Sequence, residues 1–252
     1  MMRYLRMLTF QVRQFISIPY FIQVMAVTSI TMTLIQFLAH HAWHGITPTL
    51  GWVRAGAIGL WSTATCAAGI IGFERYKGTL VHLVLAPIGT LRTLAAVVCA
   101  AASFGILALP LSWITWTLLS RSIDVELFSW PRFGSLLAGT AMLWAGATCL
   151  SLVVAALFVL TPNAISYEGL LLIPVFLLSG LTFFSHKGPA WLQVASHLLP
   201  LSQPIEVLLG QPVSILSFLS WAASTAFWFG SSALLGRRAL RLATSVGTLE
   251  VI

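Results

Sequence analysis

Three histidines form the densest group of potential metal ligands in the sequence: His40, His41 and His44. His40 and His44 are four residues apart, so both would lie on one face of a helix, as two zinc ligands can. A zinc site needs three or four ligands, and no Asp, Glu or Cys lies near these histidines in the chain. We therefore interpret them as polar residues at a membrane interface, beside Trp43. A membrane enzyme that uses them is the alternative.

No other group of residues completes a catalytic motif. Ser231 and Ser232 follow Gly230, but no strand precedes them and no His or carboxylate base is placed beside them, as a nucleophile elbow requires. The sequence also has no G-x-x-x-x-G-K-[ST] phosphate loop, so the chain has no ATPase site of its own. We expect no catalytic residue, metal or bound cofactor in this chain, and hence no enzymatic activity.

The composition is that of a protein dissolved in lipid. Hydrophobic residues make up 58% of the 252 residues and charged residues only 8%, whereas soluble domains carry roughly 25% charged residues. The net charge of +7 comes from scattered Lys and Arg that form no basic stripe, which argues against a nucleic-acid partner. Cys66, Cys99 and Cys149 all lie in apolar runs and are expected to be packing residues, not ligands or disulfide partners.

Six apolar runs are long enough to cross a bilayer, which takes about 20 residues. Backbone groups in lipid must be hydrogen-bonded internally, so these runs predict an all-α membrane protein with a single transmembrane domain over 1–252. Residues 1–18 form an amphipathic interfacial helix, 19–184 hold spans one to five, 185–210 form an outer re-entrant segment, 211–236 hold span six, and 237–252 form a cytoplasmic tail. The predicted spans are 19–40, 52–73, 94–119, 133–160, 164–184 and 213–236.

The distribution of Lys and Arg predicts the orientation. With both termini in the cytoplasm, nine of these residues fall in cytoplasmic segments and four outside, as the positive-inside rule favours. Leu5, Leu8, Val12 and Phe15 recur at helical spacing before the first span, and a helix of this pattern lies in the membrane interface. It serves as an anchor, as a lever that touches a cytoplasmic partner, or as both.

The cytoplasmic turn between spans two and three concentrates charge. Gly78 allows a sharp turn, and Thr79 can cap a short helix over 79–86 that ends before Pro87. Such a helix could insert into the groove of a partner. An ordinary positive-inside turn is the alternative.

The segment 185–210 is too apolar for a solvated loop. Pro189, Pro200 and Pro204 interrupt it, and we predict two short helices that dip into the outer leaflet and cover the outer end of the bundle.

The spans contain almost no ionisable residue near their midpoints, where an ion-coupled transporter needs one. Glu168 lies about one turn inside the cytoplasmic end of span five. If the chain moves a solute, the free energy must therefore come from elsewhere, and a separate nucleotide-binding subunit is the natural source.

Two motifs resemble those of one family, the ABC-2 type transporter permeases. The stretch from Glu74 to Leu80, followed by Leu83 and Pro87, resembles that family's acidic-x-x-x-Gly-Thr-Leu motif. The second resemblance lies before the last span and comprises Leu178-Ser179-Gly180, Pro189-Ala190-Trp191-Leu192 and Leu199-Pro200-Leu201. Six spans, an amphipathic N-terminal helix and the length of the chain match the family as well.

The resemblance implies an exporter subunit in a bacterial-type inner membrane, paired with a second permease, identical or homologous. Two copies of an ABC ATPase would dock beneath the pair and hold the ATP and Mg. The implied ATPase-coupling residues are Glu74, Arg75, Gly78, Thr79, Leu80 and Leu83. The implied outer gate comprises Pro189, Trp191, Leu199, Pro200 and Leu201, and the substrate path Trp61, Thr65, Leu172, Phe176 and Ser179.

The chain departs from the family at two places. Val81 stands where many members carry an acidic residue, and Phe183 and Phe184 stand where many carry Pro. The missing acid is compatible with a heterodimer whose sister permease supplies the usual turn. An apolar path with few charges favours a hydrophobic or amphipathic cargo, such as a drug, an antibiotic, a peptide or a lipid-linked molecule. A non-transporting immunity or assembly subunit is the further alternative.

Overall fold

The computed structural model describes residues 2–16, 19–42, 46–84, 89–122, 130–160, 168–179, 190–211 and 214–246. Within these ranges the regular structure is entirely helical, as predicted. The elements are α1 (Met2–Ile16), α2 (Pro19–Ala42), α3 (Pro48–Tyr76), α4 (Leu80–Val84), α5 (Thr90–Ser103), η1 (Phe104–Leu107), α6 (Ala108–Ser120), α7 (Trp130–Leu160), α8 (Glu168–Leu178), α9 (Ala190–Leu198), α10 (Ser202–Leu208) and α11 (Ile215–Val246).

In the described residues, four helical stretches are long and apolar enough to cross a membrane: Pro19–Ala42, Pro48–Tyr76, Thr90–Ser120 and Arg132–Leu160. They correspond to the first four predicted spans. The 11 residues of α8 are too few to cross a bilayer, and the rest of predicted span five, at 164–167 and 180–184, lies outside the described residues. With 32 residues, α11 is long enough to cross a bilayer. Ser and Thr recur along it, and it is not among the four helical stretches that are also apolar enough.

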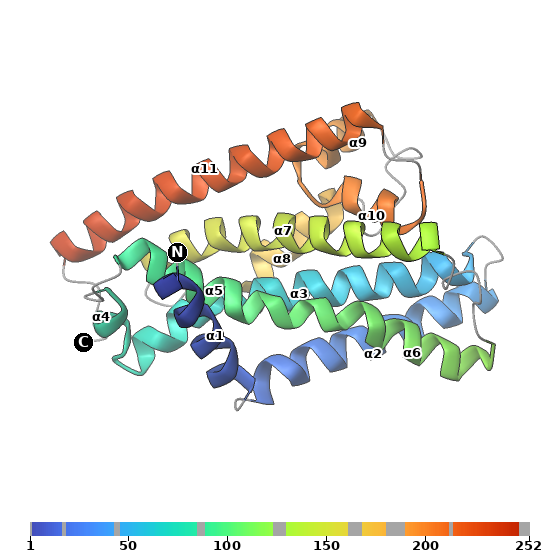
Figure 1. Cartoon of the computed structure of the whole chain (residues 1–252), viewed down its shortest axis with the longest axis horizontal. Helices are drawn as coiled ribbons and strands as arrows, with labels where there is room; N and C mark the ends of the chain where they lie inside the picture. The colour runs from blue at the N-terminus through green and yellow to red at the C-terminus, as the bar shows by residue number, and fades with distance from the viewer. Residues whose placement is uncertain are drawn as a thin grey trace.

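The long helices run side by side along the length of the molecule (Figure 1). Helix α3 lies at the centre and packs against α2, α5, α6 and α7. It is buried on all sides, with Trp61 and Leu60 almost completely inaccessible. A helix that is apolar around its whole circumference is expected at such a position.

Glycines bring neighbouring helices close to α3. A Cβ atom at Gly56 would lie 2.8 Å from the Cα of Leu109 in α6, and one at Gly105 would lie 2.9 Å from the carbonyl oxygen of Leu60. A Cβ at Gly59 would meet Ser29 of α2. Small residues allow this close packing, which is the main source of helix association in lipid.

The third predicted span, 94–119, is formed by α5, η1 and α6 together. Its 3₁₀ turn, η1, ends three residues before Pro110. Proline lacks an N–H group, and its ring displaces the carbonyl four residues earlier, so a regular α-helix is disfavoured there. The apolar run predicted the span, but the effect of its internal proline was not anticipated.

The N-terminal amphipathic helix is present as α1, and it packs against α5. Phe15 is buried and Val12 is half-buried against the core, while Arg6 and Arg13 are exposed. The apolar face of α1 is therefore partly covered by the protein itself. Its predicted position in the membrane interface stays a prediction.

Candidate functional site

The turn after α3 closes with a hydrogen-bond pattern known as a Schellman motif. The N–H of Thr79 donates to the carbonyl of Glu74 (2.9 Å), and the N–H of Gly78 donates to the carbonyl of Arg75 (2.9 Å). Gly78 has a φ of +72°, in the left-handed region that glycine adopts without steric cost. Gly78 therefore allows the sharp turn that the sequence analysis predicted.

Side chains of the same motif reinforce the turn. The hydroxyl of Thr79 donates to the Glu74 carboxylate Oε2 and lies 3.1 Å from the Glu74 carbonyl. Helix α4 begins directly afterwards, and the N–H groups of His82 and Leu83 donate to the Thr79 carbonyl at 3.1 and 3.2 Å. The predicted short helix is thus present as Leu80–Val84, and 85–86 lie outside the described residues.

Three residues attach this turn to the body of the protein. Leu80 is 1% exposed and belongs to the core, and Leu83 packs against that core. Arg75 is 3% exposed, and its Nη2 donates to the carbonyl of Val159 in the last turn of α7. A guanidinium at the C-terminus of a helix satisfies a terminal carbonyl and interacts favourably with the helix dipole. The predicted coupling residues therefore lie together, and they join α3, α4 and α7.

The outer surface of the turn is formed by three other side chains. Tyr76 is 81% exposed, and Lys77 and His82 are also exposed. Tyrosine is enriched at protein interfaces, whereas lysine is depleted there, so Tyr76 is the strongest candidate for contact with a partner. These three lie at the end of the bundle where α1 and α4 are found (Figure 1). The sequence analysis did not single them out; the signal was their position within a turn whose other residues have structural roles.

The predicted outer gate lies toward the opposite end of the molecule, where α10 packs against α7 and α9 packs against α11 (Figure 1). The segment contains two short helices, as predicted, although entry into the membrane is not tested. Leu199, Pro200 and Leu201 connect them and are buried. The Pro200 carbonyl approaches Gly146 of α7 so closely that no Cβ atom fits there. Trp191 is exposed, and Pro189 lies outside the described residues.

Polar side chains fix this pair of helices to α11. The hydroxyl of Ser224 and the indole N–H of Trp228 both donate to the carbonyl of Leu198, at 2.7 and 2.8 Å. The hydroxyl of Ser202 donates to the Ser196 carbonyl (2.8 Å). Because Leu198 is the last residue of α9, two donors from α11 cap that helix. The sequence analysis missed Ser224 and Trp228, since their partner is a backbone atom 26 and 30 residues away.

The predicted substrate-path residues lie on α3 and α8, which pack against each other. Trp61 and Thr65 are buried in the chain's own core, and the Thr65 hydroxyl donates to the Trp61 carbonyl at 2.9 Å. Ser179 is buried at the end of α8. The side chains of Leu172 and Phe176 lie outside the described part of the chain. As placed, Trp61 and Thr65 act as packing residues, and their contact with a substrate stays a prediction.

The histidines at the end of α2 are bound to backbone carbonyls. His40 Nδ1–H donates to the Ile46 carbonyl, and His41 Nδ1–H donates to the Phe37 carbonyl at 2.9 Å. The two rings lie edge to face with centroids 5.3 Å apart. No group of three or more His, Cys, Asp or Glu residues that could hold a metal occurs among the described residues. His44 lies outside the described residues. The membrane-enzyme alternative includes His44 and stays a hypothesis.

Comparison of the chain with models of known protein families and with curated proteins finds no match.

Proposed function

We propose that this chain is the membrane-spanning subunit of an ATP-driven exporter, with the turn from Glu74 to Leu83 as the docking site for a separate ATPase subunit. The observation that carries the proposal is the construction of this turn. Glu74, Gly78 and Thr79 fix its shape by hydrogen bonds and by a positive φ, while Tyr76 remains 81% exposed. A rigid turn that presents an aromatic side chain loses little conformational entropy on binding.

The connections of the turn also suit a coupling role. Arg75 joins it to the end of α7, and Leu80 anchors it in the core. A force applied at α4 would therefore act on α3 and α7 together, which are two of the four described helices apolar enough to span a membrane. Exporters of this kind need such rigid connections because nucleotide binding and substrate release occur at separate sites.

The proposal includes six spans, with α8 and α11 contributing to the last two, and both termini in the cytoplasm of a bacterial-type inner membrane. A second permease and two ATPase copies would complete the complex, and α9 with α10 would close the outer end. The buried positions of Trp61 and Thr65 mean that a substrate path at these residues would have to open by helix movement. The proposed cargo is hydrophobic or amphipathic.

Co-purification with an ATPase subunit, which we expect to be encoded beside this gene, tests the proposal. Tyr76→Ala removes the exposed aromatic side chain without touching the hydrogen bonds of the turn, and we expect at least about tenfold weaker ATPase binding, as for a central interface aromatic. Trp130→Ala is the matched control, because Trp130 is 88% exposed at the beginning of α7, at the opposite end of the bundle.

Equal ATPase binding by the wild-type chain and the Tyr76→Ala variant would contradict the assignment of the docking turn. Failure of the wild-type chain to bind any ATPase would contradict the exporter itself. Sealed vesicles that contain the complex but accumulate no hydrophobic cargo would favour the immunity or assembly alternative.

A further inference from the structure

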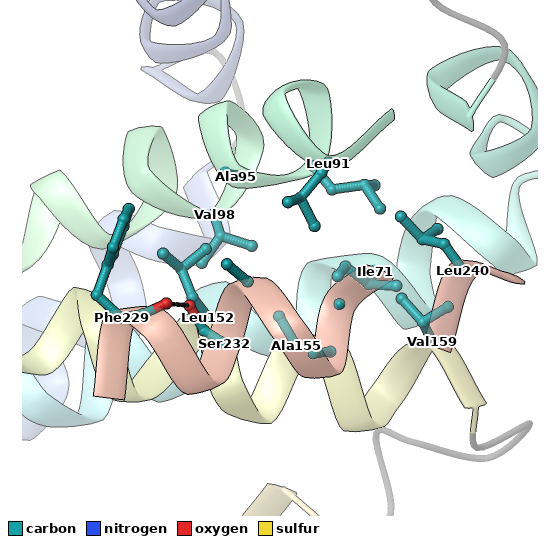
Figure 2. A pocket seen from close by; sticks show the side chains of 14 residues that line it. Ile71, Leu91, Ala95, Val98, Leu152, Ala155, Val159, Phe229, Ser232 and Leu240 are labelled. Atoms are coloured by element: carbon teal, nitrogen blue, oxygen red, sulfur yellow. Dashed lines mark hydrogen bonds between the residues drawn. The ribbon is translucent and has the colours of Figure 1, made fainter. Parts of the chain in front are cut away.

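An apolar groove opens between α5 and α11, and its floor is formed by α7 and the end of α3 (Figure 2). Leu91, Ala95 and Val98 line one wall. The other wall comprises Phe229, Ser232, Ala233, Gly236 and Leu240, and the floor Ile71, Leu152, Ala155, Ala156 and Val159. The one hydroxyl, that of Ser232, donates to the Phe229 carbonyl at 2.8 Å, so the lining offers no donor to a polar ligand.

Small residues create the hollow. Ala155 and Ala156 form part of the floor, and Ala95 and Ala233 face it from the two walls. At Gly236 the walls come together, since a Cβ atom there would lie 2.6 Å from the Cδ1 of Leu91. Leu91 therefore lies directly against α11 at Gly236.

The length of the groove matches one leaflet of a bilayer. Phe229 lines one end and Leu240 the other (Figure 2). At 1.5 Å per helical residue, these positions are about 16 Å apart along α11. The hydrocarbon core of a bilayer is about 30 Å thick, so one leaflet contributes about 15 Å. An extended acyl chain in one leaflet would run beside the whole groove.

Positive charge is concentrated at one end only. Arg92 follows Leu91 on α5, and Arg237 and Arg241 lie on α11 beside Leu240; all three are exposed. Arg237 and Arg241 are one turn apart and thus share an edge of the helix. At the Phe229 end the lining is apolar. The groove is therefore apolar along its length and cationic at the end near α4.

We propose that this groove binds one acyl chain of an anionic phospholipid, whose headgroup phosphate lies among Arg92, Arg237 and Arg241. Arginine pairs with phosphate through charge-assisted hydrogen bonds, and clusters of basic residues at a membrane surface select anionic lipids. A second copy of this chain would need an apolar ridge with acidic residues opposite the arginines. This sequence has only six Asp and Glu in total, so the charge pattern fits the lipid better. The site does not depend on the proposed ATPase partner.

Native mass spectrometry of the full-length chain tests the site after incubation with an equimolar mixture of phosphatidylglycerol and phosphatidylcholine. We expect one retained phosphatidylglycerol per chain. Ala233→Leu and Ala95→Leu fill the groove from opposite walls, and each should lower lipid retention at least fivefold. Ala226→Leu is the matched control, since Ala226 is an exposed residue of the same helix outside the lining and should leave retention unchanged.

A second experiment tests recognition of the lipid headgroup by the arginines. It leaves the packing of the groove intact, so its result can be interpreted even if the leucine variants fail to fold. The double variant Arg92→Gln and Arg237→Gln should retain lipid but lose its preference for phosphatidylglycerol over phosphatidylcholine. Unchanged preference would overturn the proposal. Unchanged lipid retention by a folded Ala233→Leu variant would overturn the proposal too. So would a wild-type chain that is a dimer and an Ala233→Leu variant that is a monomer, because the groove would then be an interface between copies.

Discussion

At the scale of single residues, the turn after α3 separates two kinds of residue. Gly78 supplies the positive φ, and Thr79 and Glu74 bond to each other, so these three are explained by the fold. Tyr76 and Lys77 are exposed at the same turn. Glu74, Gly78 and Thr79 can therefore define the shape of the turn, while Tyr76 and Lys77 remain accessible at its surface.

Replacement of Gly78 by alanine is predicted to strain this shape. The left-handed region costs an L-residue roughly 1–2 kcal/mol, although a Cβ atom at position 78 would meet nothing within 4 Å. We expect Gly78→Ala to lower the free energy of unfolding of the purified chain in detergent by about 1 kcal/mol, measured as a lower midpoint of thermal unfolding. We also expect it to weaken ATPase binding. Gly230→Ala is the control, because Gly230 also has open space around it but lies inside α11, where alanine is the better helix former. Equal stability of Gly78→Ala and the wild-type chain would show that the turn does not require this φ.

At the scale of elements, the positions of the helices could be predicted from the sequence, but the contacts between helices could not. The first four apolar runs correspond to described helices within a few residues, because a spanning helix needs a long run that is easily recognised. The run itself does not say which side faces lipid and which faces protein, since both are apolar. The run therefore did not show that Trp61 and Thr65 are buried in the core of the chain, and their assignment to a substrate path stays a prediction.

Other features of the elements depend on contacts between distant residues. The break at η1 follows from Pro110, which a search for apolar runs passes over. The bonds from Ser224 and Trp228 to the end of α9 need the folded geometry. The docking turn was predictable because Gly78, Thr79 and Glu74 interact within six residues of chain. Local motifs were thus accessible from sequence, and helix-to-helix contacts were not.

The packing of α3 against α6 supplies a prediction for the elements. Gly56→Ala places a Cβ atom 2.8 Å from the Cα of Leu109, and a backbone atom of a packed helix cannot move aside easily. We expect a loss of about 1–3 kcal/mol, as for overpacked cores, measured as a lower midpoint of thermal aggregation in detergent. The matched variant Gly134→Ala makes the same change in α7, where nothing lies within 4 Å. Because alanine is the better helix former, Gly134→Ala should not destabilise the chain. A stability loss of equal size in both variants would mean that contact with α6 does not determine the result.

At the scale of the whole molecule, the helices carry the two candidate sites to opposite ends. The docking turn and α4 lie at one end, and α9 with α10 lie toward the other (Figure 1). A protein that couples an event on one side of a membrane to an opening on the other needs this separation. The cationic end of the lipid groove is at the α4 end, because Leu91 and Leu240 flank it there. The docking turn and the arginines should therefore face the same, cytoplasmic, side.

Labelling of single cysteines in intact cells checks this orientation. The three native cysteines, Cys66, Cys99 and Cys149, are buried or half-buried and are first replaced by alanine. A cysteine is then introduced at Tyr76 or at Trp130, which are 81% and 88% exposed at opposite ends of neighbouring helices. We expect a membrane-impermeant maleimide to label Trp130→Cys in intact cells and Tyr76→Cys only in inverted vesicles, because the excess of Lys and Arg holds the α4 end inside. Labelling of Tyr76→Cys from outside would place the docking turn away from ATP and would exclude a cytoplasmic ATPase as its partner.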